Sequence, residues 1–250
     1  MNANHISPFK RLATELSNII ASTPDGQRLP SEPDLARQLR VSRATLREAM
    51  RAFEGQGLLR RKQGIGTFVV GHSEVIESGL EVLESIETLA QRIHLPVTMG
   101  ALAVSQSSAD VEEAAALGMD SGSPLTQIAR VLWVEARPVA YLIDRLPLDV
   151  VTPEELQHGF TGSVLDLLLQ RGSPPLSQSR TEIHAVAATA EIAHLLEIQR
   201  GDVLLCFTAD LYTQSGRVID HSFSYFLPGF FRFHVVRSVG STHTVAWTNQ

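Results

Sequence analysis

The stretch Leu29–Val70 decides the fold, and it reads LPSEPDLARQLRVSRATLREAMRAFEGQGLLRRKQGIGTFVV. Ser31 and Ser42 each precede a run with helical apolar spacing, so each is expected to be the N-cap of a short helix. The apolar positions of the two runs are Leu35, Ala36, Leu39, Leu46, Met50 and Phe53. Two short amphipathic helices joined by a tight turn predict a helix-turn-helix.

A β-hairpin is predicted directly after the second helix. Residues 58–63 read as a strand with the basic run Arg60-Arg61-Lys62, and residues 67–70 read as its partner. Gly64-Ile65-Gly66 lies between them and supplies the glycines of a turn. A helix-turn-helix followed by a basic hairpin is a winged helix, which predicts DNA binding.

The second helix is expected to enter the major groove. Arg43 and Arg47 lie four residues apart near its start, so they share a face that leaves Leu46 free to enter the core. The N-terminal residues of a recognition helix are the ones that reach base edges, whereas the hairpin is expected to meet phosphates and the minor groove. The residues predicted to contact DNA are Ser31, Ser42, Arg43, Thr45, Arg47, Arg60, Arg61, Lys62, Gln63, Gly64, Gly66 and Thr67.

A small helical bundle with solvated arginines is the competing interpretation of these residues. Three features weigh against it: small Ala36 where two helices would cross, arginines on the leading turn of the second helix, and the glycine-rich basic hairpin that follows. The winged helix is therefore the preferred fold for residues 1–70.

The charge of the chain is divided along its length. Residues 1–72 hold 11 Lys and Arg against 6 Asp and Glu, a net charge of +5, whereas residues 73–250 hold 10 against 21, a net charge of −11. A basic first segment and an acidic remainder predict a DNA-binding head on a body that does not bind DNA.

The composition is that of a globular protein, with 44% of the 250 residues apolar and 19% charged. No apolar run approaches the roughly 20 residues that span a bilayer, and the N-terminus shows no signal-peptide core. The single cysteine, Cys206, excludes an internal disulfide and a cysteine-based zinc site. These features predict a cytoplasmic protein without a membrane partner.

Residues 71–91 are predicted to be a linker and residues 92–240 a second domain. In that domain, short strands joined mostly by hairpins alternate with a few helices, for example over residues 164–171 and 189–196. This pattern predicts a mostly antiparallel sheet with helices on it, so the whole chain is expected to be α+β.

The first segment resembles the N-terminal winged helix of the GntR family of bacterial transcription regulators. The residues that carry the resemblance are Leu29-Pro30-Ser31-Glu32, Leu35-Ala36, Val41-Ser42-Arg43, Thr45, Arg47-Glu48-Ala49, Gly57-Leu58 and Gly64-x-Gly66-Thr67-Phe68-Val69. Pro33 is a departure, because the family often carries Arg at this position, and it puts one DNA contact of the relatives in question here. The resemblance implies a homodimer on double-stranded operator DNA with two-fold symmetry.

Residues 92–238 are similar to the UTRA effector domain of the HutC branch of that family, a fold that also resembles chorismate lyase. The features that carry the similarity are Arg130, Pro138, Pro147, Ser163-Val164-Leu165-x-x-Leu168, Ile183-His184-Ala185, Gly201-Asp202-Val203-Leu204, Asp220-x-Ser222-x-x-Tyr225-Phe226 and Phe231-Arg232-Phe233. The similarity implies a cleft that binds a small metabolite, and binding there changes how two heads are presented to DNA.

The similarity implies that the effector-binding residues are Arg130, Tyr141, Ser163, Asp220, Ser222 and Tyr225. Arg130 is expected to be a charge-assisted clamp for an anion, and Ser163 to lie at a helix N-terminus that favours an anion. On the late strand, Asp220 and Ser222 alternate onto one face, whereas Tyr225 faces away unless a bulge intervenes. An equal alternative makes Arg130 and Asp220 a structural ion pair and Ser163 only a helix cap.

The chemical class of the effector stays open at this point. Relatives often carry a second arginine two positions after Arg130, and those that bind sugar phosphates carry a glutamate on the next strand. Leu132 and Leu142 stand at these positions here. The departures weigh against a phosphosugar, so an anionic effector and a less charged or more apolar one are both retained.

No metal site, cofactor or catalytic residue is predicted. None of the nine histidines shows His-x-x-x-His spacing, and the chain has no Cys-x-x-Cys and no Gly-x-Ser-x-Gly motif. The predicted function is a ligand-responsive transcription regulator, a repressor released from its operator by a small metabolite. Two alternatives stay open: a constitutive DNA-binding protein with a non-functional effector domain, and a lyase-like enzyme in residues 92–238.

Overall fold

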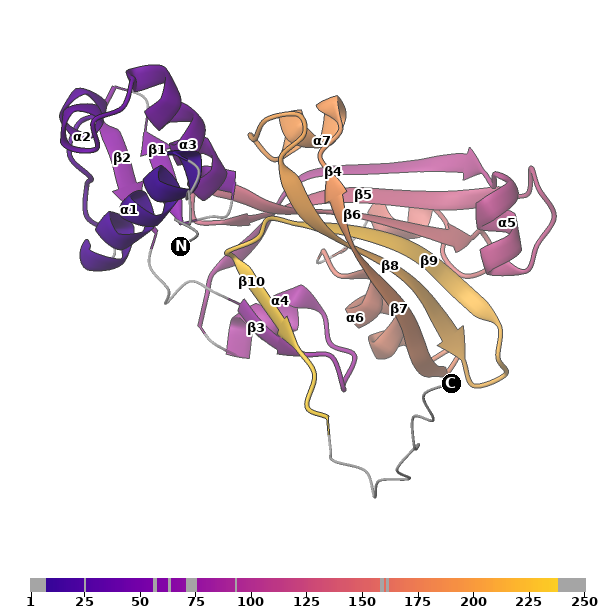
Figure 1. Ribbon diagram of the computed structural model, residues 1–250. Helices are drawn as coiled ribbons and strands as arrows, with labels where there is room; N and C mark the ends of the chain where they lie inside the picture. The colour runs from indigo at the N-terminus through magenta and orange to yellow at the C-terminus, as the bar shows by residue number, and fades with distance from the viewer. Residues whose placement is uncertain are drawn as a thin grey trace, which may run out of the picture.

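The computed structural model describes residues 8–24, 26–55, 58–62, 64–70, 76–92, 94–157, 160 and 162–237. Two domains follow one another along the chain, a head of residues 8–70 and a larger sheet domain of residues 76–237 (Figure 1). Gly57 and Gln63, which the sequence analysis singles out, lie outside the described residues, as does the start of the predicted linker, residues 71–75.

The head has the predicted winged-helix fold. Its described elements are α1 (Pro8–Ser22), α2 (Glu32–Gln38), α3 (Arg43–Gly55), β1 (Leu59–Lys62) and β2 (Gly66–Val69). β1 and β2 form an antiparallel hairpin. Leu16, Leu35 and Leu46 contribute one fully buried side chain from each helix to a single apolar core. Because this core uses the apolar face of each helix, the polar face of α3 is left to solvent.

The two predicted N-caps differ. The backbone N–H of Thr45 donates to Ser42 Oγ (3.1 Å), so Ser42 caps α3 as predicted. Ser31 occupies the N-cap position of α2, but its hydroxyl donates to Asp34 Oδ2 (2.5 Å) and makes no cap hydrogen bond. The predicted side-chain cap at Ser31 is therefore wrong, because the nearby carboxylate engages the hydroxyl.

This difference predicts unequal costs for two serine replacements. Ser42→Ala is expected to lower the free energy of unfolding of the head by about 1 kcal/mol, because an N-H at the start of α3 loses its acceptor. Ser31→Ala is the matched control and is expected to cost less than half of that, since an exposed hydroxyl–carboxylate contact is all it loses. Thermal melting of the two full-length variants compares them, and equal losses would contradict the assignment of the caps.

The sheet domain contains the remaining described elements. They are β3 (Ile76–Gly79), α4 (Ile86–Arg92), β4 (Val97–Ser108), α5 (Val111–Leu117), β5 (Pro124–Val134), β6 (Arg137–Pro147), a 3₁₀ helix (Glu154–Gln157), α6 (Val164–Arg171), β7 (Leu176–Ala187), α7 (Ala190–Leu195), β8 (Val203–Thr213), β9 (Val218–Phe226) and β10 (Phe231–His234).

The described strands β4 to β9 form one antiparallel sheet in the order β4-β5-β6-β9-β8-β7. α4, α6 and the pair of β3 with β10 lie on one side of this sheet, and α7 lies on the other (Figure 1). The predicted α+β class, with a winged helix followed by a mostly antiparallel sheet and helices, is confirmed. Strand alternation assigns each side chain of the sheet to one of these two sides.

The predicted linker of residues 71–91 is part of the sheet domain from Ile76 onward. β3 pairs in parallel with β10, and Ile76 lies opposite Phe231. Ile86 and Leu89 of α4 are buried in the core of the sheet domain. In sequence the segment resembles a linker, because it mixes Glu with apolar residues. Its role in the sheet domain could not be predicted locally, since β10, the strand that pairs with it, lies near the other end of the chain.

Candidate functional site

The leading turns of α3 form an exposed polar face on the head. Arg43, Thr45 and Arg47 are exposed, whereas Leu46 and Met50 on the other face are fully buried. The two predicted groove-facing arginines are therefore free of the core. A helix presented in this way can insert into a major groove without disturbing the packing of the head.

Glu32 connects the predicted DNA-contacting arginines of two elements. Its Oε2 accepts from Arg47 Nε (2.7 Å), and its Oε1 forms an ion pair with Arg61 of β1. The Glu32 side chain is only 15% exposed, so its carboxylate is held in place. Glu32 thus orients Arg47 and Arg61 relative to one another. Sequence reasoning missed this role, although Glu32 belongs to the matched Leu-Pro-Ser-Glu motif.

Arg28 is a second residue that sequence reasoning missed. Its side chain is exposed and lies against Gly66 in the hairpin, where a Cβ atom would collide with the guanidinium. Gly66 also has φ of +141°, a conformation that side chains disfavour. Gly66 therefore leaves room for the guanidinium of Arg28, which packs over the hairpin. If the hairpin approaches DNA at Gly66 as predicted, Arg28 adds a positive charge beside it.

Three predicted DNA contacts on the hairpin have different surroundings. Arg60 turns toward the sheet domain and forms an ion pair with Glu135 (3.0 Å), so its predicted phosphate contact would require this ion pair to open. Thr67 is 6% exposed and cannot reach DNA with its side chain. Strand alternation explains Arg60, because neighbouring Arg60 and Arg61 must point to opposite sides of β1. The side chain of Lys62 lies outside the described part of the structure.

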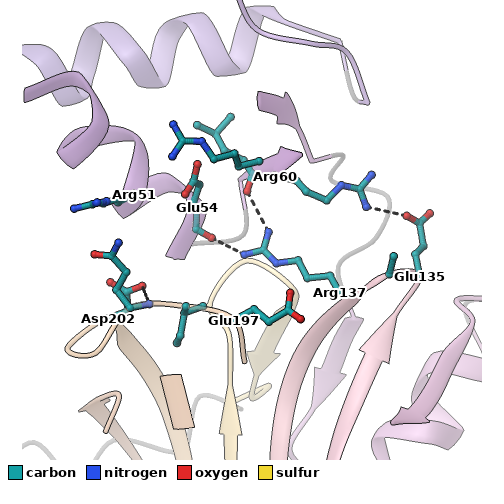
Figure 2. A pocket seen from close by; sticks show the side chains of 12 residues that line it. Arg51, Glu54, Arg60, Glu135, Arg137, Glu197 and Asp202 are labelled. Carbon is teal, nitrogen blue, oxygen red and sulfur yellow. Dashed lines mark hydrogen bonds and ion pairs between the residues drawn. The ribbon is translucent and has the colours of Figure 1, made fainter. Parts of the chain in front are cut away.

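Arg137 ties the sheet domain to the head (Figure 2). From the start of β6, its Nη2 donates to the carbonyl oxygen of Glu54 at the end of α3 (2.9 Å), and its Nη1 donates to that of Leu59 at the start of β1 (3.1 Å). Its guanidinium lies 5.1 Å from the centre of the Phe230 ring. These contacts border a cleft of about 520 Å³ between the domains. They attach the hairpin β5–β6 to both head elements that are predicted to face DNA.

Removing the hydrogen bonds of Arg137 to the head is expected to make the two domains unfold at different temperatures. In Arg137→Met, two carbonyl oxygens lose a charged donor, each such bond being worth about 1.5–3 kcal/mol. Differential scanning calorimetry should then resolve an earlier transition for the head. Arg60→Met is the control, because its half-exposed ion pair contributes about 1 kcal/mol at most. A single unchanged transition in Arg137→Met would contradict this role.

A cavity of about 540 Å³ lies between the sheet and the segment of residues 78–87. Its floor consists of alternate residues from neighbouring strands that share one side of the sheet. They include Arg130, Leu142, Asp144, Phe207, Ala209, Asp220, Ser222 and Ser224. Four of the predicted effector residues line the cavity, namely Arg130, Ser163, Asp220 and Ser222. Ser163 also caps α6, since its Oγ accepts from the backbone N–H of Asp166 (3.0 Å).

Tyr141 and Tyr225 lie on the other side of the sheet. They are opposite one another across β6 and β9, with ring centres 6.3 Å apart, and neither lines the cavity. Their inclusion among the effector residues is wrong. Alternation places their neighbours Leu142 and Ser224 in the cavity instead.

Arg130 is buried in the cavity floor and already paired. It is 4% exposed, its Nη1 forms an ion pair with Asp144, and its Nε lies 3.9 Å from Glu87 Oε1. Burial lowers the pKa of Arg130, but the charges of Asp144 and Glu87 more than offset this and the net shift is upward. Arg130 is therefore part of a structural ion pair, but the pair predicted with Asp220 is wrong in its partner, which is Asp144.

Asp220 lies beside this pair with an unsatisfied oxygen. It is 6% exposed, and its Oδ1 has no hydrogen-bond partner among the described residues. Burial, followed by the charge of Asp144, raises the pKa of Asp220 well above its ordinary value of 3.8, although Arg130 lowers it in part. The folded protein therefore keeps a proton on this side chain at pH values where an exposed aspartate is ionised.

The raised pKa of Asp220 predicts a pH-dependent stability difference. Between the unfolded and the folded pKa the native state binds more protons, so the stability of the wild type falls as the pH rises through this interval. Asp220→Asn carries no such penalty. Its melting temperature should exceed that of the wild type by a margin that is absent below pH 3.8 and grows as the pH rises. Melting curves across pH test this, and a constant difference would contradict it.

No group of three or more His, Cys, Asp or Glu side chains among the described residues is arranged to hold a metal ion. Within the same residues, no helix is long and apolar enough to cross a membrane.

Comparison with known proteins identifies both domains. The family described as "Bacterial regulatory proteins, gntR family" matches residues 9–69, and the UTRA domain matches residues 94–232. The cavity-lining residues 78–87 therefore lie outside both matches. The HTH-type transcriptional repressor NagR of Bacillus subtilis is 31% identical over 232 residues, covering 89% of this chain and 92% of that protein.

Two other relatives agree with this match. A histidine utilization repressor of Pseudomonas putida is 31% identical over 199 residues, covering 78% of this chain and 77% of that protein. The crystal structure of PhnF from Mycobacterium smegmatis has a TM-score of 0.63 at 24% identity, covering 92% of this chain and all of that one, which shows a common fold. With a winged-helix head and a UTRA domain in the same order, the chain belongs to the HutC branch of the GntR family of bacterial regulatory proteins.

Proposed function

We propose that the protein represses transcription by binding a two-fold symmetric operator as a homodimer, and that a small molecule in the cavity releases it. The observation that carries this proposal is the position of residues 78–87. They line the cavity and follow the hairpin of the head after a few residues. A ligand that moves this segment therefore acts on the chain where it leaves the DNA-binding head.

Further contacts support coupling between the cavity and the head. Val70, at the end of the head, packs against the core of the sheet domain, as do Ile86 and Leu89 of the cavity-lining side. Arg137 connects the same domain to α3 and β1. A ligand shifts the orientation of the heads only by as much as it prefers one arrangement over the other. These contacts provide a physical connection through which such a preference can act.

The sign of regulation, the oligomeric state and the location are part of the proposal. The relatives NagR and the histidine utilization repressor are named as repressors, which supports repression. A homodimer is supported by the requirement that paired half-sites be read by paired heads. A DNA-binding regulator works where the chromosome is, so we place it in the cytoplasm.

We also propose that the sheet domain binds its ligand without transforming it. The lyase-like alternative is opposed by the lack of a cation cluster: Arg130 is the single cation among the described residues that line the cavity, and it forms an ion pair with Asp144. The alternative of a non-functional effector domain is opposed by the cavity itself. A domain without a ligand gains nothing from burying Asp220 with an unsatisfied oxygen in a cavity of about 540 Å³.

The proposal is tested by operator selection with the full-length protein. Random double-stranded DNA is bound, recovered and sequenced over several rounds, and a two-fold symmetric sequence is the expected product. Light scattering then gives the stoichiometry of the complex, with two chains per operator expected. Recovery of unselected DNA, or binding of one chain to an asymmetric site, would overturn the proposed dimeric repressor.

A further inference from the structure

We propose that the cavity binds an organic cation, whose protonated nitrogen donates hydrogen bonds to Asp220 and Glu87 beside Arg130. The proposal rests on the proposed function, because it names the ligand class of the same cavity. It departs from the anion clamp that the family resemblance implies for Arg130.

The charges around the cavity favour a cation. Of the described residues that line it, Glu87, Asp144 and Asp220 are acidic at its floor, and Arg130 is the single cation. With every group ionised, this cluster has a net charge of −2. Glu81 and Glu84 add two acids nearer the rim, where Glu84 is paired with Arg92. A proton on Asp220 reduces this excess in the folded protein, and a bound cation would supply positive charge in place of that proton.

The positive charge of Arg130 is already balanced by two neighbouring acids. Asp144 occupies one end of its guanidinium, and Glu87 lies on the side of Nε at 3.9 Å. An anion that replaced Asp144 on Arg130 would leave Asp144, which is 8% exposed, buried without its partner. Leaving one member of a buried ion pair uncompensated is strongly unfavourable.

Three buried atoms at the site have no hydrogen-bond partner among the described residues: two carboxylate oxygens and one donor, Arg130 Nε, which lies 3.9 Å from Glu87 Oε1 and is too far away to satisfy it. Asp220 Oδ1 and Glu87 Oε1 are both buried without a hydrogen-bond partner among the described residues. Buried polar atoms are nearly always paired in folded proteins, so these oxygens indicate a missing N–H donor. Burial raises the pKa of both carboxyl groups, and a bound cation would reverse that effect by stabilising their charged forms.

The other residues that line the cavity indicate which chemical group carries the charged nitrogen of the ligand. Ser222 and Ser224 add hydroxyls along the floor beside Asp220. Phe207, Phe226 and Phe233 form an aromatic cluster at the same cavity, with the Phe207 and Phe233 ring centres 4.4 Å apart. The cavity therefore suits an amine attached to an apolar or aromatic group.

Matched probes that differ only in charge test the proposal. The full-length protein is melted with 2-phenylethylamine, 2-phenylethanol and 3-phenylpropanoate, and with pentylamine, pentanol and hexanoate. Inorganic phosphate serves as a further anion. At about 100 times its Kd, a bound amine is expected to raise the melting temperature by roughly 5–10 °C, whereas the alcohols, carboxylates and phosphate leave it unchanged.

Two variants test whether the rise in melting temperature caused by the amine depends on the acids of the cavity. Asp220→Asn is expected to abolish the response to the amine, and Glu87→Gln to reduce it, which keeps the test valid if either variant folds poorly. Asp149→Asn is the matched control, because it removes the same charge from an exposed carboxylate that pairs with Arg217 outside the cavity. Its response to the amine should equal that of the wild type.

The possible outcomes separate this inference from the proposed function. A larger response to a carboxylate or phosphate, no response to either amine, or an unchanged response in Asp220→Asn would each overturn the cation site. Operator binding is measured on the same samples. A protein that binds its operator and is released by an anion refutes only the cation site, whereas a protein that selects no operator refutes the proposed function.

Discussion

The double variant Arg43→Ala/Arg47→Ala is expected to bind the operator at least about 30-fold more weakly than the wild type, because each base-contacting arginine is worth about 1–3 kcal/mol. Both side chains are exposed on the leading turns of α3 and only the ion pair of Arg47 with Glu32 is lost, so the melting temperature should fall only slightly. Fluorescence anisotropy with labelled operator and with unrelated DNA, at one fixed salt concentration, measures the loss and its sequence dependence.

Glu32→Gln tests whether Arg47 and Arg61 must be held in a fixed orientation to select the operator, because it leaves both arginines in place. The Glu32 carboxylate binds both Arg47 and Arg61, and its loss frees these side chains without removing their charge. We expect unrelated DNA to bind as before or more tightly, while the preference for the operator falls.

The double variant Arg43→Ala/Arg47→Ala has its own control. Arg180→Ala removes a positive charge from an exposed residue of β7, far from the predicted DNA-binding face, and should leave operator affinity nearly unchanged. If the double variant also keeps wild-type operator affinity, α3 is not the recognition helix.

The second large effect is expected from Arg130→Met. Removing one partner of a buried ion pair costs about 3–5 kcal/mol, and here it leaves Asp144, Glu87 and Asp220 without a nearby cation. For a chain of this size the melting temperature should fall by roughly 6–20 °C. The loss should shrink at acidic pH, because protonation of the remaining carboxyl groups removes their uncompensated charge.

A second substitution shows whether the charge imbalance is the cause. Arg130→Met/Asp144→Leu replaces the pair by apolar side chains and should recover much of the lost stability. Chemical denaturation of the wild type, the single variant and the double variant measures both steps. If Arg130→Met instead keeps its stability and loses only the response to ligand, Arg130 is an anion clamp and the interpretation of the ion pair is wrong.

The head could be predicted in detail because its determinants are local. The cap at Ser42, the apolar spacing of Leu46 and Met50, and the glycines of the hairpin all act within a few residues. Arg60 has a partner that local reasoning could not predict even there. A basic run predicts phosphate contacts for all its members, yet only one side of a strand can face DNA, and Arg60 instead meets Glu135 of the other domain.

The cavity was only partly predictable, because its composition depends on long-range pairing. Alternation along β9 correctly placed Asp220 and Ser222 on one side of the sheet, and it also predicted that Tyr225 faces the other side. The register between β6 and β9, which no local pattern specifies, excludes Tyr141 and brings Leu142 and Ser224 into the cavity. The same long-range packing makes Glu87, from the predicted linker, a neighbour of Arg130.

The winged helix, the antiparallel character of the second domain and the family could all be inferred from the amino-acid sequence, because periodicity, caps and turn residues act over short distances. The partners of the charged residues, in contrast, depend on the three-dimensional packing of the chain. Arg130 meets Asp144 and Glu87, and Arg137 meets the backbone of the head, through contacts between segments far apart in the chain. The strength and meaning of a charge depend on its burial and its neighbours, and both are set by packing.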